Sequence, residues 1–354
     1  MSTVPFSERG GKARGCLDLV SGRFPAFVFG GGLGAFLPVF HFHEVAREEL
    51  EPKLRHLADN GYRTVVSEDI DGFVRGVRTL PARSVALCFD DAWKSVATVA
   101  APLLKQYGLT AITYAIPARI ADETDAASPF VSWRELGDIA RSGTIDVQSH
   151  TDSHARVFAS ADVEAFVQPG YEATPLLNRP QLTPAPSPVF VTPNDLGAPL
   201  YGMRSRMSDG RRALVSRDVH ASCVNIVARE GGPAFFERPD WRNRLMTIVT
   251  SASTAAFESD AERERAIEDE LARSRAVLNE RLKTQTVAHI CLPWGISGTT
   301  TEAALKRTGY RSAFANRLRG QHAVHAGDDP YWLKRLPNHY ITRLPGRGRQ
   351  YWFS

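Results

Sequence analysis

The stretch Val85-Ala86-Leu87-Cys88-Phe89-Asp90-Asp91 decides the fold predicted for this chain. Its apolar run ends in two adjacent carboxylates, the pattern of a buried strand with polar side chains at its C-terminal tip. A second run, Ile145-Asp146-Val147-Gln148-Ser149, ends in His150 and, four residues on, His154. Because α/β sheets and barrels build their active sites at the C-terminal ends of strands, we expect both tips to face one cavity.

Strand-like and helix-like segments alternate around these two runs, which argues for a parallel sheet or barrel covered by helices. The predicted strands are Phe24–Phe29, Leu37–Phe42, Thr64–Val66, the SVALCF run, Thr110–Ala115, the DVQS run, Thr286–Leu292 and Arg311–Ala315, with a last extended segment Trp332–Ile341. The predicted helices are ELEPKLRHLAD before Asn60-Gly61, Glu68–Gly76, Ala97–Tyr107, Trp133–Arg141, a long helix from a Ser259/Glu262 capping box to near Lys283, and Thr301–Arg307.

The alternation breaks between about residues 168 and 240. Eight prolines crowd positions 169–199, and proline at this density excludes regular helix or central strand. Phe235, Phe236 and Trp241 exclude a solvated linker, so we expect an ordered insertion that packs over the site as a lid or side wall. The predicted domains are an N-terminal extension with the first strand (1–36), a core (37–167 and 256–345) and the insertion (168–255).

Composition bounds the function classes. A net charge of +4 with no basic block among aromatics gives no reason to expect nucleic acid as a partner. The four cysteines are widely spaced and form no CxxC pair, so we expect reduced thiols. The oligomeric state is left open.

The longest apolar stretch, residues 24–42, raises the question of a membrane anchor or export signal. Glycines, prolines and His41 interrupt it, whereas a spanning helix needs about 20 apolar residues. A signal peptide would begin nearer the N-terminus and end in small residues. We therefore expect two strands joined by a glycine loop, no integral membrane span and a cytoplasmic protein.

The polar residues at the two strand tips suit a metal centre. Asp90-Asp91 alone is typical of a helix cap or a solvated turn, and His150-x-x-x-His154 alone is more often structural. Together, at the ends of strands expected to lie side by side, they offer one carboxylate and two imidazoles to a divalent cation. The second carboxylate would then be available as a base.

Three motifs carry a family resemblance. Cys88-Phe89-Asp90-Asp91-Ala92-Trp93 is similar to a T-F-D-D-G motif, and His150-Thr151-Asp152-Ser153-His154 matches H-[S/T]-x-x-H. Leu292-Pro293-Trp294-Gly295 with the later Gly309-Tyr310 resembles a third motif region. Through residues 37–154 and 258–342 the chain resembles the polysaccharide deacetylase (NodB-homology) family, which removes acetyl groups from N- or O-acetylated sugars. This resemblance implies a distorted (β/α) barrel.

Carried over residue by residue, the resemblance implies Asp91, His150 and His154 as metal ligands and Asp90 as the general base. Zn²⁺ is the first expectation for the cofactor, and Co²⁺, Ni²⁺ or Mn²⁺ would also suit this ligand set. A bound cation lowers the pKa of water from about 15.7 toward 7 and polarises the acetyl carbonyl.

The third motif region is expected to contact the substrate. A backbone N–H of the Pro293-Trp294-Gly295 turn is a candidate oxyanion donor. Trp294 could stack on a sugar face, with a buried core tryptophan as the alternative. His43, at the end of an early strand, is a further candidate for substrate contact, with a structural role as its alternative.

The chain departs from the family pattern at several positions. Ala92 replaces the usual glycine, and Cys291 stands where many members have an arginine that orients the base carboxylate. We predict that Arg335 supplies that guanidinium instead. His339, in the segment LPNHYI, is our choice for the general acid.

The other late histidines are weaker candidates. His322 and His325 lie in a polar stretch that reads as a loop, and His289 reads as a core residue.

The resemblance thus predicts hydrolysis of an N-acetylated sugar to an amine and acetate. The expected cytoplasmic location favours a small, lipid-linked or nucleotide-linked sugar over a bulk polymer. Two alternatives stay open: a hydrolase of non-sugar amides or cyclic imides on the same fold, and a glycan-binding pseudoenzyme, for which the missing arginine at Cys291 leaves room.

Overall fold

The computed structural model describes residues 25–350 apart from 124, 126, 173–178, 184–187, 252–255 and 316–322. This part of the chain divides into two compact units. The first comprises the described residues up to Ser153, Glu270–Ser297 and those from Leu305 onward. The second comprises His154–Asp269 and Gly298–Ala304, so its limits differ from those predicted for the insertion. The predicted domain boundaries themselves stay a prediction.

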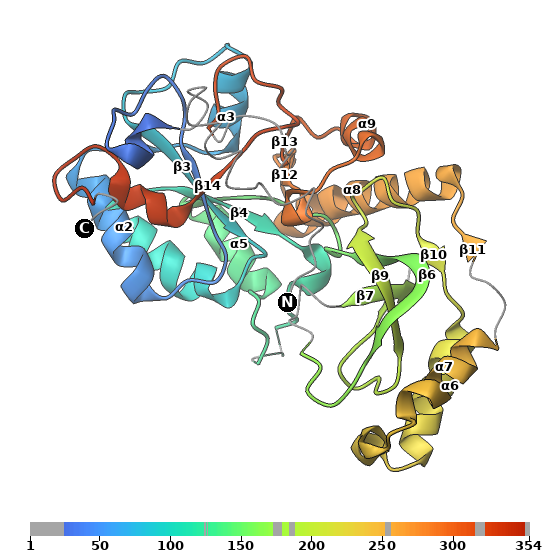
Figure 1. Cartoon of the computed structure of the whole chain (residues 1–354). Helices are drawn as coiled ribbons and strands as arrows, with labels where there is room; N and C mark the ends of the chain where they lie inside the picture. Colours follow the sequence, from blue (N-terminus) through green and yellow to red (C-terminus); the bar gives the residue numbers. More distant parts are fainter. Residues whose placement is uncertain are drawn as a thin grey trace. The chain divides into compact units, whose positions relative to one another are not determined.

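The first unit is a distorted (β/α) barrel of parallel strands (Figure 1). Its strand order is β13-β12-β5-β4-β3-β1-β14, with β2 beside β3. An isolated parallel bridge links Phe314 of β13 to Leu333, which lies three residues before β14. The strands are β1 (Val39–Phe42), β2 (Arg63–Thr64), β3 (Ser84–Asp90), β4 (Ala111–Ala115), β5 (Ile145–Ser149), β12 (His289–Cys291), β13 (Ser312–Phe314) and β14 (Leu336–Pro337).

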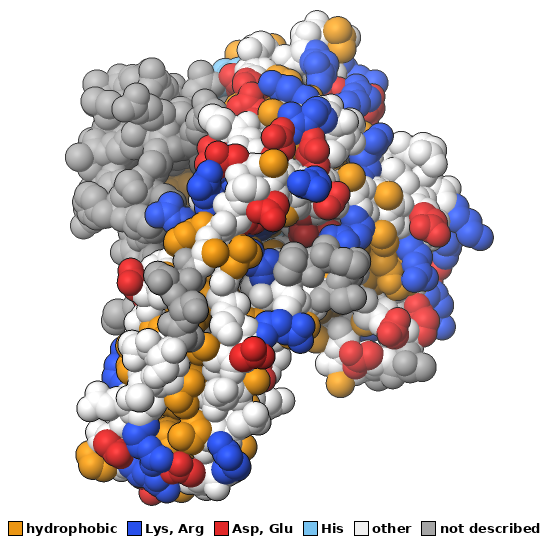
Figure 2. Space-filling model, turned by 90° about the vertical axis from the view of Figure 1, so that its right-hand side faces the viewer, with side chains coloured by type: hydrophobic (Ala, Val, Ile, Leu, Met, Phe, Trp, Pro, Cys, Tyr) orange, Lys and Arg blue, Asp and Glu red, His pale blue; other side chains and the backbone are white. Residues whose placement is uncertain are grey.

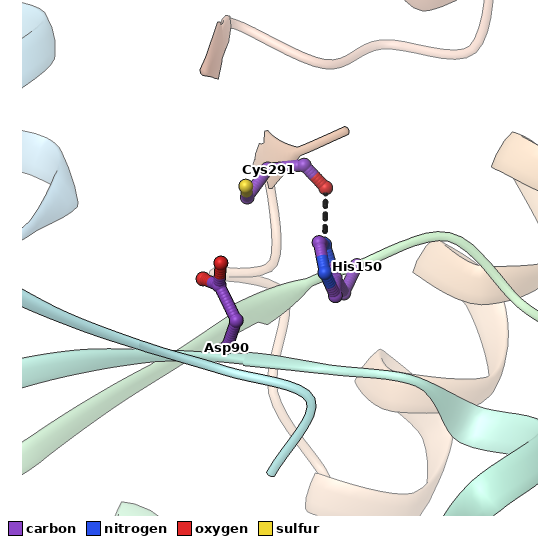
Figure 3. A group of neighbouring side chains, drawn as sticks. All are labelled: Asp90, His150 and Cys291. Atoms are coloured by element: carbon purple, nitrogen blue, oxygen red, sulfur yellow. Dashed lines mark hydrogen bonds between the residues drawn. The ribbon is translucent and has the colours of Figure 1, made fainter. Parts of the chain in front are cut away.

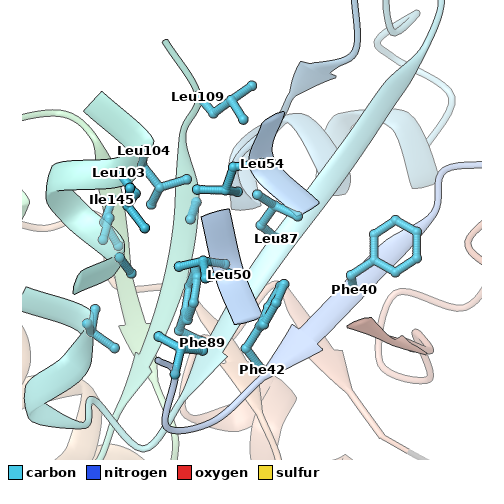
Figure 4. Close-up of a cluster of buried hydrophobic side chains, with 14 of the residues drawn as sticks. Phe40, Phe42, Leu50, Leu54, Leu87, Phe89, Leu103, Leu104, Leu109 and Ile145 are labelled. Carbon is cyan, nitrogen blue, oxygen red and sulfur yellow. The ribbon is translucent and has the colours of Figure 1, made fainter. Parts of the chain in front are cut away.

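Helices cover the outside of this barrel. They are α2 (Arg47–Asp59), α3 (Ser67–Val74), α4 (Ala101–Tyr107) after a π-helical turn (Val96–Ala100), α5 (Trp133–Arg141), α8 (Asp260–Leu282) and α9 (Thr299–Arg307), the last two of which extend into both units. Leu50, Leu54 and Leu57 of α2 are fully buried against the strand residues Leu87 and Phe89, as Figure 4 shows in part. This i, i+4, i+7 spacing is the apolar stripe that predicted the helix.

The second unit is built mainly of β-strands and two helices. One sheet has the order β8-β7-β6-β9, and β10 pairs with β11 in a two-stranded sheet. Phe166, Cys223 and Phe235 belong to one of its cores. The elements are β6 (Arg156–Phe166), β7 (Pro180–Thr183), β8 (Val189–Phe190), β9 (Pro199–Ser205), β10 (Ala213–Leu214), α6 (Arg217–Arg229), α7 (Trp241–Thr250) and β11 (Ala256–Phe257).

The prediction that the proline-rich region excludes a central strand is wrong, because β7 lies between β8 and β6 in its sheet. Pro180 and Pro199 are the first residues of β7 and β9, where strands accommodate a residue that lacks an N–H. The helix α6 begins at Arg217, after these prolines, and its N-cap Ser216 accepts a side-chain hydrogen bond from the Val219 N–H. The density of prolines therefore does not predict the strands that form between the loops of this region.

Two predicted strands are also corrected. The predicted strand Phe24–Phe29 starts outside the described residues, and Ala26–Phe29 forms a 3₁₀ helix that Gly30 ends with a φ of 94°. Its backbone N–H groups bond locally within this turn. The extended segment Trp332–Ile341 is a strand only at Leu336–Pro337, after which Asn338–Arg343 forms a 3₁₀ helix.

The surface gives two further observations. Basic and acidic side chains are intermixed on the face drawn in Figure 2, so the described residues of this face form no broad field of one sign. Among the helices of the described residues, none is both long and apolar enough to cross a membrane.

A buried ion pair in the second unit provides a stability test. Arg206 donates to both carboxylate oxygens of Glu258 at 3.0 and 2.7 Å, and the Arg212 N–H donates to the same carboxylate. Because Glu258→Ala leaves a buried guanidinium without its carboxylate, we expect it to lower the free energy of unfolding by about 3–5 kcal/mol. Urea unfolding followed by circular dichroism measures this.

Arg211→Ala is the matched control, since it breaks the exposed pair between Arg211 and Asp260. Its unfolding midpoint should stay close to that of the wild type. Equal losses in the two variants would contradict the structural role assigned to the buried pair.

Candidate active site

The two predicted strand tips lie at the same edge of the barrel. β3 ends at Asp90 and β5 at Ser149, one residue before His150, and β4 pairs with both strands. Asp91 and Ala92 then adopt left-handed φ angles of 70° and 53°. This tight turn interrupts the strand alternation that would point Asp90 and Asp91 to opposite faces. The backbone conformation at Ala92 favours glycine, so an alanine at this position carries some backbone strain.

Asp90 is held by a largely buried guanidinium. Arg335 donates two hydrogen bonds, Nη1 to Oδ1 at 2.6 Å and Nη2 to Oδ2 at 2.8 Å. The same guanidinium lies 5.9 Å from the ring centroid of Tyr114 and 5.6 Å from that of Phe314. Burial alone would raise the pKa of Asp90, but the Arg335 charge and hydrogen bonds outweigh it and hold the pKa below its usual value. The carboxylate is therefore ionised at neutral pH.

His150 has a defined proton arrangement. Its Nδ1 lies 2.6 Å from the Cys291 carbonyl oxygen, drawn in Figure 3, and Nε2 lies 3.3 Å from Asp91 Oδ1. Because a carbonyl oxygen only accepts, Nδ1 carries a proton and Nε2 is the atom that can bind a cation. Burial lowers the pKa of His150, but the interactions with Cys291, Asp91 and Asp90 outweigh burial, so the pKa is raised above its usual value.

Asp91 is oriented by an interaction that the sequence analysis missed. Trp93 Nε1 donates to Asp91 Oδ2 at 3.1 Å, and the indole stacks on Phe130 at 5.0 Å between ring centroids. Oδ1 is the carboxylate oxygen that faces His150. An indole two residues after the paired carboxylates is the signal that could have suggested this contact.

The predicted ligands fit a divalent cation. Asp91, His150 and His154 each offer one ligand atom, and these atoms lie within 4.8 Å of one another. Four-coordinate zinc with bonds of about 2.0–2.2 Å places its ligand atoms about 3.4 Å apart, a distance that small side-chain rotations reach. Two imidazoles and a carboxylate are also the donor set that such cations prefer. Their role as ligands stays a prediction.

The loop that carries His150 is clamped by the helix α8. Glu270 Oε1 accepts from both the N–H and the hydroxyl of Ser153, at 2.6 and 2.7 Å. Arg273, on the same helix face, donates to the Asp152 carboxylate at 2.6 Å, and the Ala118 N–H donates to the Asp152 carbonyl. These buried contacts hold a turn in which Thr151 and His154 both have positive φ.

Two histidines of the β1 segment lie near the base. His43 Nε2 is 3.7 Å from Asp90 Oδ2, and the His43 side chain is 57% exposed. His41 contacts the His43 ring edge-on at 5.8 Å, and its buried Nδ1 makes no hydrogen bond within the described part of the chain. Burial, followed by the Arg335 charge, lowers the pKa of His41 to about 4, so this imidazole is neutral at physiological pH.

The Pro293-Trp294-Gly295 turn has the tight geometry expected of it. Trp294 has a φ of 55° and is half-buried, and the Gly295 N–H donates to the Leu292 carbonyl at 2.9 Å. Proline has no N–H and that of Gly295 serves the turn, so an oxyanion donor here would have to be the Trp294 N–H. That role, and sugar stacking by Trp294, stay predictions.

Two of the remaining histidines, His339 and His289, differ in their exposure to solvent. His339 is exposed and belongs to a 3₁₀ helix, not to the extended segment predicted for it. Its ring packs against Tyr340 at 4.1 Å between centroids. His322 lies outside the described residues, and His289 is buried, as expected of a core residue.

Comparison with known proteins finds similarity in the segment that carries the two strand tips. Residues 77–169 match the family model of polysaccharide deacetylases. The chain is 30% identical over 131 residues to a poly-β-1,6-N-acetyl-D-glucosamine N-deacetylase of Escherichia coli K12, a match that covers 34% of this chain and 20% of that protein. The chain thus matches about a fifth of the length of this relative.

Solved structures show the same fold at low sequence identity. A de-N-acetylase of Aggregatibacter actinomycetemcomitans superposes with a TM-score of 0.52 at 17% identity, over 85% of this chain and 94% of that one. The BpsB deacetylase domain of Bordetella bronchiseptica gives a TM-score of 0.56 at 16% identity, over 86% and 96%. These similarities support the distorted barrel.

The Glu270 clamp generates a prediction about cation affinity. Glu270→Ala removes the acceptor of both Ser153 hydrogen bonds, so the His150 loop should lose its fixed position. We expect the affinity for Zn²⁺ or Co²⁺ to fall about 10–100-fold, measured by competition with a chromophoric chelator.

Glu270→Gln is the matched control, because its amide oxygen can still accept from Ser153. It should bind the cation much more tightly than Glu270→Ala does. Wild-type affinity in Glu270→Ala would show that the clamp does not position the site.

Proposed function

We propose that this chain hydrolyses the acetamido group of an N-acetylated glycan, a proposal supported by the match of residues 77–169 to the polysaccharide deacetylase family model. The products are a free amine on the sugar and acetate. The observation that carries this proposal is an ionised, guanidinium-paired Asp90 next to a three-residue cation site, with the exposed imidazole of His43 3.7 Å away.

Asp91, His150 and His154 would hold the divalent cation. When bound, the cation acidifies water and polarises the acetyl carbonyl, with Zn²⁺ as our first choice. His150 keeps Nε2 available because its Nδ1 proton is committed to the Cys291 carbonyl. Trp93 supports the ligand geometry by engaging the far oxygen of Asp91.

Asp90 accepts the proton that water loses as it adds to the acetyl carbon. Its two oxygens each accept one hydrogen bond from Arg335, and carboxylate oxygens retain further lone pairs for that proton. Arg335 has two effects: it keeps the carboxylate ionised, and it fixes the plane in which the lone pairs point. General base catalysis of this kind contributes about 10²–10⁴-fold to rate.

His43 is our proposed proton donor to the leaving nitrogen. As the C–N bond breaks, the electron pair goes to nitrogen, which takes a proton from His43 Nε2. His43 suits this step because it is exposed yet lies 3.7 Å from the base. His339, the choice made from the sequence, is itself exposed on a 3₁₀ helix where its ring packs against Tyr340, and it becomes the second candidate.

An oligomer of β-1,6-linked N-acetylglucosamine is the first substrate to test, since that sugar is named for the Escherichia coli relative. The cytoplasmic location, which favoured a smaller sugar, stays a prediction. The pseudoenzyme alternative is weakened because Arg335 supplies the guanidinium that Cys291 lacks.

We expect the purified protein to release acetate from such oligomers, and chelation of the cation to abolish this. Asp90→Asn should lower kcat by about 10²–10⁴-fold, because an amide cannot take the proton, while the bound metal is retained. Enzymatic acetate assays and metal analysis measure both quantities.

Small amides and cyclic imides serve as the competing substrates. Turnover of these in place of sugar oligomers would refute the glycan proposal. Full activity of Asp90→Asn would refute the role of the base.

Arg335 gives a pH prediction with a defined sign. Without the guanidinium, burial raises the pKa of Asp90, so the ionised base is lost at a higher pH. In Arg335→Met the acid limb of the kcat/KM profile should therefore move to higher pH than in the wild type. Arg343→Met, an arginine on the neighbouring 3₁₀ helix, should leave the limb unmoved. An unshifted limb in Arg335→Met would contradict this role.

A further inference from the structure

We propose a second cation site, formed by Cys291, Asp90 and His150, that takes thiophilic d¹⁰ cations such as Cd²⁺ and thereby blocks the catalytic centre. The inhibition part rests on the proposed function, whereas binding of the cation does not. All three residues belong to the barrel unit.

The three side chains converge on one point. A ligand atom from each, the Cys291 sulfur, an Asp90 oxygen and a His150 nitrogen, lies within 4.8 Å of the other two. They come from three strand ends, those of β12, β3 and β5, and Figure 3 shows the Cys291 thiol above the Asp90 carboxylate with His150 beside them. All three residues are buried, so a bound cation would be shielded from competing water.

The donor atoms determine which cations this site selects. Thiolate sulfur is a soft ligand that prefers cations such as Cd²⁺, whereas Asp91, His150 and His154 offer oxygen and nitrogen. As the sulfur binds, the thiol proton leaves to solvent and the S–H bond is replaced by a sulfur–metal bond. Cys291 stands at a position where the family resemblance implies an arginine, so this donor set is a property of this chain.

Charge keeps the second site closed to ordinary cations. The Arg335 guanidinium already neutralises Asp90 and repels a further positive charge, and no second carboxylate belongs to this donor set among the described residues. Only a cation whose bond to sulfur is strong offsets this repulsion. Zn²⁺ at low concentration should therefore occupy the Asp91 set first.

The two sites exclude each other. His150 belongs to both ligand sets, and Asp90 is the proposed base. A cation bound to Cys291 would take an imidazole from the catalytic cation and the lone pairs that accept the proton. Occupancy of the second site is therefore inhibitory.

Cadmium titration of the metal-loaded protein tests this proposal with two readouts. Sulfur-to-cadmium charge-transfer absorption in the ultraviolet reports thiolate binding without any assay of activity. Acetate release reports inhibition. We compare the wild type with Cys291→Ser and with Cys88→Ser, a matched control in which another buried thiol of the same apolar cluster is removed.

We expect the absorption and the inhibition in the wild type and in Cys88→Ser. In Cys291→Ser the absorption should disappear, and the cadmium concentration for half-inhibition should rise at least about ten-fold, the scale on which a lost ligand interaction weakens metal binding. Cys291→Ala replaces this variant if circular dichroism shows that the serine form is unfolded.

Two results would overturn the proposal. One is equal absorption in the wild type and in the Cys291 variant. The other is an absence of thiolate absorption in the wild type, which decides against the site whatever the variants do. If the protein has no deacetylase activity, the absorption readout still decides for or against the second site, so the two proposals fail separately.

Discussion

The buried ion pair between Arg335 and Asp90 is the interaction on which the site depends. Without it, the pKa of the carboxylate at the end of β3 would be higher, because burial disfavours the charged form. The partner arrives from a segment 245 positions away, beside the short strand β14 that pairs with β1. Breaking such a pair is costly because it leaves one charge buried and unpaired. The segment that adds β14 to the sheet therefore also supplies the guanidinium that holds the proposed base.

The fold could be predicted where local signals agreed with tertiary packing. α5 has the predicted limits, and its capping box between Ser132 and Glu135 accounts for its sharp start. The box between Ser259 and Glu262 likewise precedes α8. Predictions were wrong where proline alone was taken to exclude a central strand, or where an apolar run alone was taken to indicate a strand. Ala26–Phe29 is apolar but bonds to itself in a 3₁₀ turn, and the insertion builds strands that begin at proline. The spacing of apolar residues along the sequence predicts neither this 3₁₀ helix nor these strands.

Some features of the candidate site could likewise be predicted from the sequence, and others could not. Residue types and motif spacing identified Asp91, His150 and His154, and the structure brings their ligand atoms together. Arg335 was proposed as the guanidinium next to the base carboxylate, and the structure pairs it with Asp90, but motif spacing alone cannot show a contact between residues 245 positions apart. The Trp93 indole on Asp91 and the Glu270 clamp are side-chain contacts with no sequence signature of their own. His339 was chosen as the general acid from its place in the chain, whereas the proposal of His43 rests on its distance from Asp90, which the sequence does not give.

The central claim is that one divalent cation is shared by Asp91, His150 and His154 while Asp90 remains paired with Arg335. Anomalous diffraction from crystals of the protein loaded with Zn²⁺ tests it most directly. The account predicts one strong peak at about 2.0–2.2 Å from a ligand atom of each of the three residues, with both Arg335 hydrogen bonds intact. A peak elsewhere, or a cation bound by Asp90 in place of Asp91, would contradict it.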